Sequence, residues 1–137
     1  MTEMEKMADI DEMMYGCDAG ILHTGDESLR MAKYLQVFTT TDKPEDAERI
    51  ANTLVENRLA GCVQIVGPVV STYWWRGNME TTEEWLCLIK TRQDLYSRLE
   101  IALKQIHPYE TPEIVAVPIT AGSKENLDWL TDELASE

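Results

Sequence analysis

A proline-rich corner, residues 106–114 with the sequence IHPYETPEI, constrains the fold of this 137-residue chain more than any other stretch. Pro108 and Pro112 each fix one φ angle and remove one backbone donor. The residues before them, His107 and Thr111, are pushed towards extended geometry, so a preceding helix must end here. The corner displays an imidazole, a phenol and two carboxylates on a short, stiff connector. That arrangement suits a binding site, and it equally suits a structural turn between a helix and a strand.

The composition indicates one folded domain that is not built to bind polyanions. Hydrophobic residues make up 44% of the chain, which includes four tryptophans and five tyrosines. A net charge of −13 disfavours nucleic acid and anionic membranes as partners, because phosphate contacts need clustered lysine and arginine. No apolar run approaches the roughly 20 residues of a membrane span. The N-terminus lacks the basic and apolar regions of a signal peptide, so we expect a cytoplasmic protein.

Residues 1–30 differ from the rest of the chain. They carry eight acidic residues against Lys6 and Arg30, and their apolar residues show no convincing periodicity. We therefore expect residues 1–30 to be an acidic, disordered leader before a folded domain at 31–137. The alternative is that the natural chain starts at Met31.

The folded part alternates between strand and helix patterns. The expected strands are 33–40, 60–66 continuing as 69–75, 83–90 and 114–120. The expected helices are 44–57, 93–106 and a terminal helix that begins after Ser123 and turns Leu127, Leu130 and Leu134 inward. Asp42 and Glu45 have the spacing of a capping box for the first helix, and residues 76–78 predict a hairpin turn. The β-α-β-β-α-β order predicts an α+β ferredoxin-like sandwich with an extra C-terminal helix.

Alternation along the strands divides the predicted sheet into two faces. The set expected to meet the helices is Leu35, Val37, Val63, Ile65, Leu86, Leu88, Val115 and Val117. The opposite set is Phe38, Cys62, Val66, Trp85, Cys87, Ile89, Ile114 and Ala116, together with Gln36 and Gln64. This second face is too apolar to be left in water, and one spare helix is too little to cover it. We therefore expect a homo-oligomer.

Four motifs of the chain resemble one known family. They are LAGCVQI, YWWRGNME, HPYETPEI and NLDWL, and they occur in the order and spacing of the CutA divalent-cation tolerance proteins between about Met31 and Leu134. The resemblance implies a ferredoxin-like protomer in a tight homotrimer, with long hairpins that extend the sheets of neighbours. It also implies a role in tolerance of copper and other divalent ions. The family's trimer resembles that of PII-type signalling proteins, which implies a ligand cleft between subunits.

Only some of the family's site residues are present at the matching positions of this chain. The copper site of bacterial members uses a cysteine near the end of the first strand and two consecutive histidines at the corner. This chain has Phe38 and Ile106 at two of these places, so only His107 remains. We expect His107, Glu113 and Cys62 to be the candidate ligands of a weak site for Cu(II) or another divalent cation.

A second hypothesis is a PII-like trimeric sensor that binds a small anionic metabolite between subunits. The cleft would use Tyr73, Trp75, Lys90 and Tyr109. An enzyme is not expected. Acylphosphatases share this order of elements, but they need an anion-binding loop with arginine after the first strand, and the connector here, TTTDKPED, is acidic and has no glycine.

Overall fold

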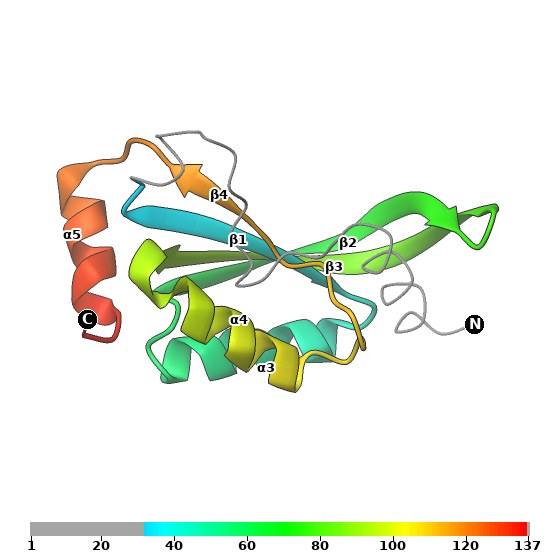
Figure 1. Cartoon of the computed structure of the whole chain (residues 1–137), viewed down its shortest axis with the longest axis horizontal. Helices are drawn as coiled ribbons and strands as arrows, with labels where there is room; N and C mark the ends of the chain where they lie inside the picture. The colour runs from blue at the N-terminus through cyan, green and yellow to red at the C-terminus, as the bar shows by residue number, and fades with distance from the viewer. Residues whose placement is uncertain (1–31, 137) are drawn as a thin grey trace.

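The structure, a computed structural model, describes residues 32–136, so the predicted leader at 1–30 lies outside the described residues. Its elements are β1 (Tyr34–Thr41), α3 (Pro44–Glu56), β2 (Cys62–Trp75), β3 (Asn78–Arg92), the short 3₁₀ turn η1 (Gln93–Leu95), α4 (Tyr96–Ile106), β4 (Val115–Ile119) and α5 (Lys124–Glu133). The strands form an antiparallel sheet in the order β2-β3-β1-β4 (Figure 1). The predicted ferredoxin-like α+β architecture is confirmed.

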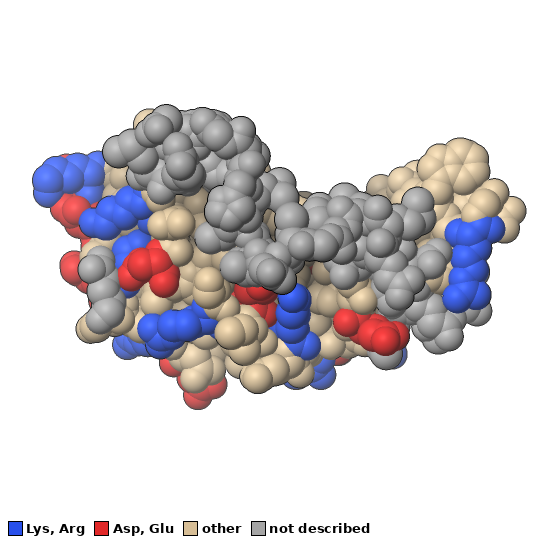
Figure 2. All heavy atoms as spheres, in the orientation of Figure 1, with Lys and Arg blue, Asp and Glu red and all other residues tan. Residues whose placement is uncertain are grey.

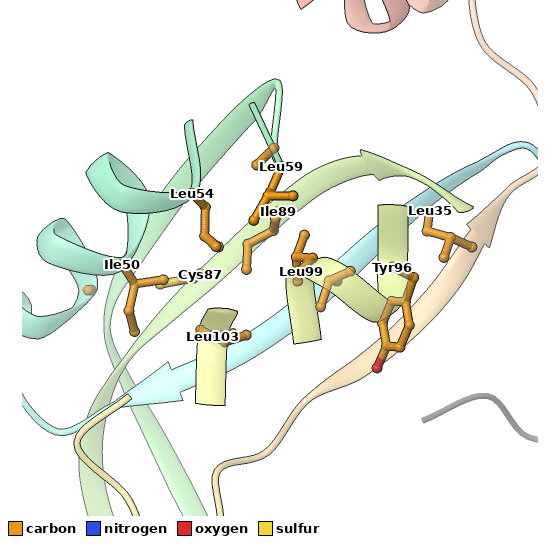
Figure 3. Close-up of a cluster of buried hydrophobic side chains, with 12 residues drawn as sticks. Leu35, Ile50, Leu54, Leu59, Cys87, Ile89, Tyr96, Leu99 and Leu103 are labelled. Carbon is orange, nitrogen blue, oxygen red and sulfur yellow. The ribbon is translucent and has the colours of Figure 1, made fainter. Parts of the chain in front are cut away.

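Helices α3 and α4 lie side by side on one face of the sheet and form the main core. Figure 3 shows Ile50 and Leu54 of α3 and Leu99 of α4 directed towards the sheet residues Cys87 and Ile89. All five side chains are fully buried. Burial raises the pKa of the Cys87 thiol to about 11, so this cysteine is a small core residue rather than a reactive group.

Helix α5 packs across the end of the sheet, where β1 begins and β3 ends (Figure 1). Leu130 and Leu134 are buried against Tyr34 and Leu95, with Leu127 partly buried beside them, so the predicted inward row of leucines is confirmed. Ser123 caps the helix by accepting a hydrogen bond from the backbone N–H of Asn126 over 3.2 Å.

The capping box predicted for α3 is absent. Pro44 occupies the first turn, so the N-cap is Lys43 rather than Asp42, and no side chain caps the helix. Asp42 therefore lies one residue too early for its carboxylate to bond the orphan N–H groups of the first turn.

The predicted division of the sheet into two faces is right for β1 and β2 and wrong for β3 and β4. Trp85, Cys87, Ile89, Ile114 and Ala116 pack towards α3 and α4, while Leu86, Leu88, Val115 and Val117 point the other way. In both strands apolar residues follow one another without a break. The alternation of apolar and polar residues then does not show which side chains face the helices. An error of one residue in that assignment moves every side chain to the other face.

The face away from α3 and α4 is nevertheless apolar, as expected. Its apolar residues are Phe38, Val66, Leu86, Leu88, Val115 and Val117, and we refer to them as the open face. Val66, Val115 and Val117 have exposed fractions of 45%, 47% and 43%. A row of exposed branched side chains on one sheet face is typical of a surface that is covered by another molecule.

Strands β2 and β3 continue beyond the rest of the sheet as a two-stranded arm, residues 69–84 (Figure 1). β3 is therefore longer than predicted, because the polar residues after the turn still pair with β2. The turn at Arg76 and Gly77 has positive φ at both positions, 48° and 82°, which matches the right-handed twist of a two-residue hairpin. The register shifts between Val66 and Val69, at the break that separates the two predicted parts of this strand.

Candidate functional site

The proline corner has the backbone that its two prolines predict. Helix α4 ends at Ile106, and His107 is extended, with φ −71° and ψ 137°. Its N–H still donates to the carbonyl of Leu103 over 2.9 Å. The guanidinium of Arg49 donates to the carbonyl of Ile106 over 2.8 Å, so the end of α4 is tied to α3.

The imidazole of His107 is buried, and both of its nitrogens are occupied. Nε2 lies 2.9 Å from the carbonyl oxygen of Thr40, and Nδ1 accepts the backbone N–H of Tyr109 over 3.1 Å. This pattern requires a neutral ring with its proton on Nε2. Burial lowers the pKa of His107 to about 4, although the bond to Thr40 and the charge of Asp46 act in the opposite direction. His107 therefore joins the end of β1 to the corner.

A buried pair, Glu84 and Tyr109, forms the next layer of the site. The Tyr109 hydroxyl donates to Oε2 of Glu84 over 2.8 Å, and both residues are buried. Glu84 was not among the site residues predicted from the sequence. Its position in the sequence gives one clue to a site: an acidic residue stands directly before the apolar run of β3. Trp85, the next residue, pairs with the last residue of β1. Tyr109 thus orients a buried carboxylate beside the corner.

Glu113 completes the acidic side of the corner. Its side chain is exposed by surface area. Partial desolvation, followed by repulsion from Glu84, raises the pKa of Glu113. The two carboxylates therefore lie close enough to act on each other.

The other predicted site residues lie elsewhere in the protomer. Cys62 pairs with Lys90 across β2 and β3, and Lys90 donates to Oε1 of Gln64 over 2.9 Å. Lys90 also pairs with Gln36, four residues along β1 from Thr40 and its bond to His107. Four residues of a strand span about 13 Å, so Cys62 and His107 are not neighbours within one protomer.

Tyr73 and Trp75 lie on the arm. The Tyr73 hydroxyl is 3.3 Å from the hydroxyl of Thr82, and the guanidinium of Arg76 stacks 5.0 Å from the ring of the buried Trp75. The predicted metal and cleft residues thus fall into three groups: the corner, the far end of the sheet, and the arm. A site that joins these groups needs more than one protomer, and it stays a prediction.

Copper does not fit His107 as the corner is folded. An imidazole ligand must offer a free ring nitrogen, and both nitrogens are already hydrogen-bonded. Within residues 32–136 no group of three or more His, Cys, Asp or Glu side chains is arranged to hold a metal ion. The donors that do gather here are oxygens, from Glu84, Glu113 and Tyr109.

The fold and the corner together define a class of protein. It is a ferredoxin-like α+β protomer with an apolar open face, a long hairpin arm and a rigid proline corner. Comparison with known proteins identifies the family: the model for the CutA1 divalent ion tolerance proteins matches residues 35–133, and the chain belongs to this family.

Individual relatives agree. The divalent-cation tolerance protein CutA of Thermus thermophilus is 45% identical over 96 residues, which is 70% of this chain and 93% of the relative. The chloroplastic protein CutA of Arabidopsis thaliana is 38% identical, over 77% of this chain and 58% of the relative. The crystal structure of CutA1 from Oryza sativa superimposes with a TM-score of 0.75 at 35% identity, and covers 77% of this chain and 97% of that one.

The names of the relatives do not point to one compartment. One is called chloroplastic, and the structure from Archaeoglobus fulgidus, with a TM-score of 0.70 and 39% identity over 73% of this chain and 97% of that one, is called periplasmic. No helix within residues 32–136 is both long and apolar enough to cross a membrane. A cytoplasmic location therefore stays a prediction.

Proposed function

We propose that this chain forms a homotrimer that acts in the tolerance of divalent metal ions, as a binding protein rather than an enzyme. The main support for the proposed trimer is the apolar open face. A fully buried valine or leucine side chain contributes about 1.5–3 kcal/mol relative to an exposed one, so covering this face is strongly favourable. Membership of the CutA1 family supports the link to divalent ions.

The sheet edges support the same assembly. β2 and β4 are the edge strands, and each pairs with one neighbour among the described strands. Their outer N–H and C=O groups can accept a strand from another copy. The arm extends past the body of the protomer, where it can reach such an edge (Figure 1).

Light scattering after size-exclusion chromatography tests the assembly. We expect a mass of three times the 15.6 kDa protomer. Val66→Glu places a charge on the open face, and the desolvation of that charge opposes association. We expect it to shift the chain towards monomer. Ile101→Glu is the matched control, because Ile101 is an exposed apolar residue on α4. A monomeric wild type refutes the assembly.

Growth under metal stress tests the function. A host that lacks its own family member is expected to gain tolerance to copper, zinc or another divalent salt when it makes this chain, and to lose it with Val66→Glu but not with Ile101→Glu. Wild-type chain that is abundant and trimeric yet gives no tolerance refutes the proposed role.

Copper at His107 is the finer hypothesis that the sequence suggests. It requires the ring to leave its bonds with Thr40 and Tyr109, so we expect Cu(II) binding there to be weak. A calorimetric Cu(II) titration of the wild type beside His107→Gln tests this. Heat that is lost in the variant supports copper at the corner, and identical titrations exclude it. No contact among the described residues favours the PII-like alternative.

A further inference from the structure

Three oxygen-bearing side chains converge where β1, β3 and the start of β4 meet. Thr40 pairs with Leu86 of β3, and Glu84 is two residues further along β3 on the same face. Diagonal neighbours of this kind have Cβ atoms within roughly 7–8 Å. On the other side, Phe38 pairs with Val115 of β4. Glu113 lies two residues before Val115, on the connector that leads into β4, so it enters the same end of the sheet as Thr40 and Glu84.

Glu84 is a buried carboxyl group without a cationic partner among residues 32–136. Its exposed fraction is 4%, and the hydrogen bond it receives comes from the neutral hydroxyl of Tyr109. Among residues 32–136 no lysine, arginine or histidine forms an ion pair with Glu84 or Glu113. A buried carboxylate is costly unless it is paired or coordinates a metal. A bound cation would supply the missing countercharge.

Thr40 gives an independent indication of a ligand. Its exposed fraction is 6%, and within residues 32–136 its buried Oγ1 has no hydrogen-bond partner. Buried hydroxyls are almost always satisfied, and one that is not needs an explanation. A hydroxyl oxygen on the same sheet face as Glu84, one diagonal position away, has the right chemistry to be a further ligand.

We propose that Glu84, Glu113 and the hydroxyl of Thr40 bind one hard divalent cation, of the class of Mn²⁺ and Mg²⁺. Carboxylate and hydroxyl oxygens suit such ions, which keep several water ligands and need few protein groups. Tyr109 orients the Glu84 carboxylate from behind. The inference deepens the proposed role in divalent-ion tolerance, because it names a site and a class of ion different from copper at His107.

The test is a titration of the full 137-residue chain with MnCl₂, followed by the loss of the electron paramagnetic resonance signal of hydrated Mn²⁺. We expect saturable binding of one ion per protomer, with a Kd at or below about 1 mM. Glu84→Gln and Glu113→Gln each remove one ligand charge and are expected to weaken binding about tenfold or more. Thr40→Val keeps the shape of the side chain and should weaken binding severalfold.

The matched control is Glu83→Gln. Glu83 is exposed and adjacent to Glu84 on β3, so this change removes the same charge from the opposite side of the strand. Diffuse attraction of Mn²⁺ to an acidic chain would fall equally in Glu83→Gln and Glu113→Gln, and that result overturns the proposal. Absence of saturable binding in the wild type also overturns it. So does wild-type affinity in all three site variants that retain the wild-type mass and circular dichroism.

The site and the proposed function can fail separately. If Mn²⁺ binding maps to these residues but the chain gives cells no metal tolerance, the site stands and the proposed function does not. If tolerance is present and unaffected by Glu113→Gln, while Mn²⁺ does not bind, the proposed function stands and the site is refuted.

Discussion

Replacing His107 with glutamine tests whether a neutral imidazole holds the proline corner together. The ring bonds the Thr40 carbonyl at 2.9 Å and the Tyr109 N–H at 3.1 Å. A glutamine amide can place its nitrogen near the Nε2 position of the ring, but it has no acceptor at the Nδ1 position, so it cannot meet both partners at once. One buried backbone group is then left unsatisfied, which costs about 1–3 kcal/mol of unfolding free energy near neutral pH.

The pH dependence separates this explanation from a simple loss of packing. Burial lowers the pKa of His107 from 6.5 to about 4, with Arg49 acting in the same direction and Asp46 against it. A group with a lowered pKa binds fewer protons in the folded state than in the unfolded one. Its stabilising contribution is complete above the unfolded pKa and is lost as the pH falls from 6.5 towards 4.

The size of the effect follows from the same linkage. Each pH unit in that window changes the unfolding free energy by up to 1.4 kcal/mol per proton, an order-of-magnitude figure. The advantage of wild type over His107→Gln should therefore shrink by about 1.5 kcal/mol between roughly pH 6.5 and pH 5. Other groups titrate in both chains and cancel in the difference.

Urea unfolding of both chains across this pH range measures the difference. One protomer concentration must be kept throughout, because the stability of an oligomer depends on it. The imidazole proton resonances give a second readout, since the signal missing from the variant identifies His107. A stability difference that does not change with pH refutes the reasoning. A His107 signal that titrates near 6.5 refutes it independently.

Three further predictions follow from the same packing. Tyr109→Phe leaves the buried carboxylate of Glu84 without its donor and should lower the unfolding free energy by about 1–3 kcal/mol in urea titrations, and an unchanged midpoint would contradict this. Gly67→Ala brings a methyl group into the ring of Trp85, and overpacking of this kind should cost about 1–3 kcal/mol, measurable by thermal melting; an equal Tm contradicts the contact. Cys87 has a raised pKa and no exposed surface, so a thiol reagent at mildly alkaline pH should label it far more slowly in the native chain than in urea.

The sequence predicted the backbone of the corner better than its chemistry. Pro108 and Pro112 act through local sterics, which depend on neighbours in the chain, and α4 ends at Ile106 as they require. The use of His107 depends on the Thr40 carbonyl, 67 residues away. No local pattern reports such a contact, so the residues alone left both interpretations, a structural turn and a binding site, open.

The same limit explains the error in β3. Its helix-facing side is set by register with β1, and β1 itself was assigned correctly because Gln36 interrupts its apolar residues. β3 has no polar residue between Trp85 and Ile89 to mark a face. An apolar second face could still be predicted. Because consecutive residues of β3 are apolar, either assignment of its side chains leaves apolar groups on the face away from the helices.

Metal preference follows from which atoms of the corner are still available. The two imidazole nitrogens, the donors that would favour copper, are bonded within the protein, and the thiol predicted as a ligand, Cys62, lies at the other end of the sheet. The remaining donors, from Glu84, Glu113 and Thr40, are oxygens. Sites built from oxygen ligands favour hard ions. They bind copper and zinc less tightly than sites that also contain nitrogen or sulfur ligands. Ca²⁺ or Mg²⁺ should therefore displace Mn²⁺ from the chain. Displacement by Zn²⁺ alone would mean that another set of ligands holds the ion.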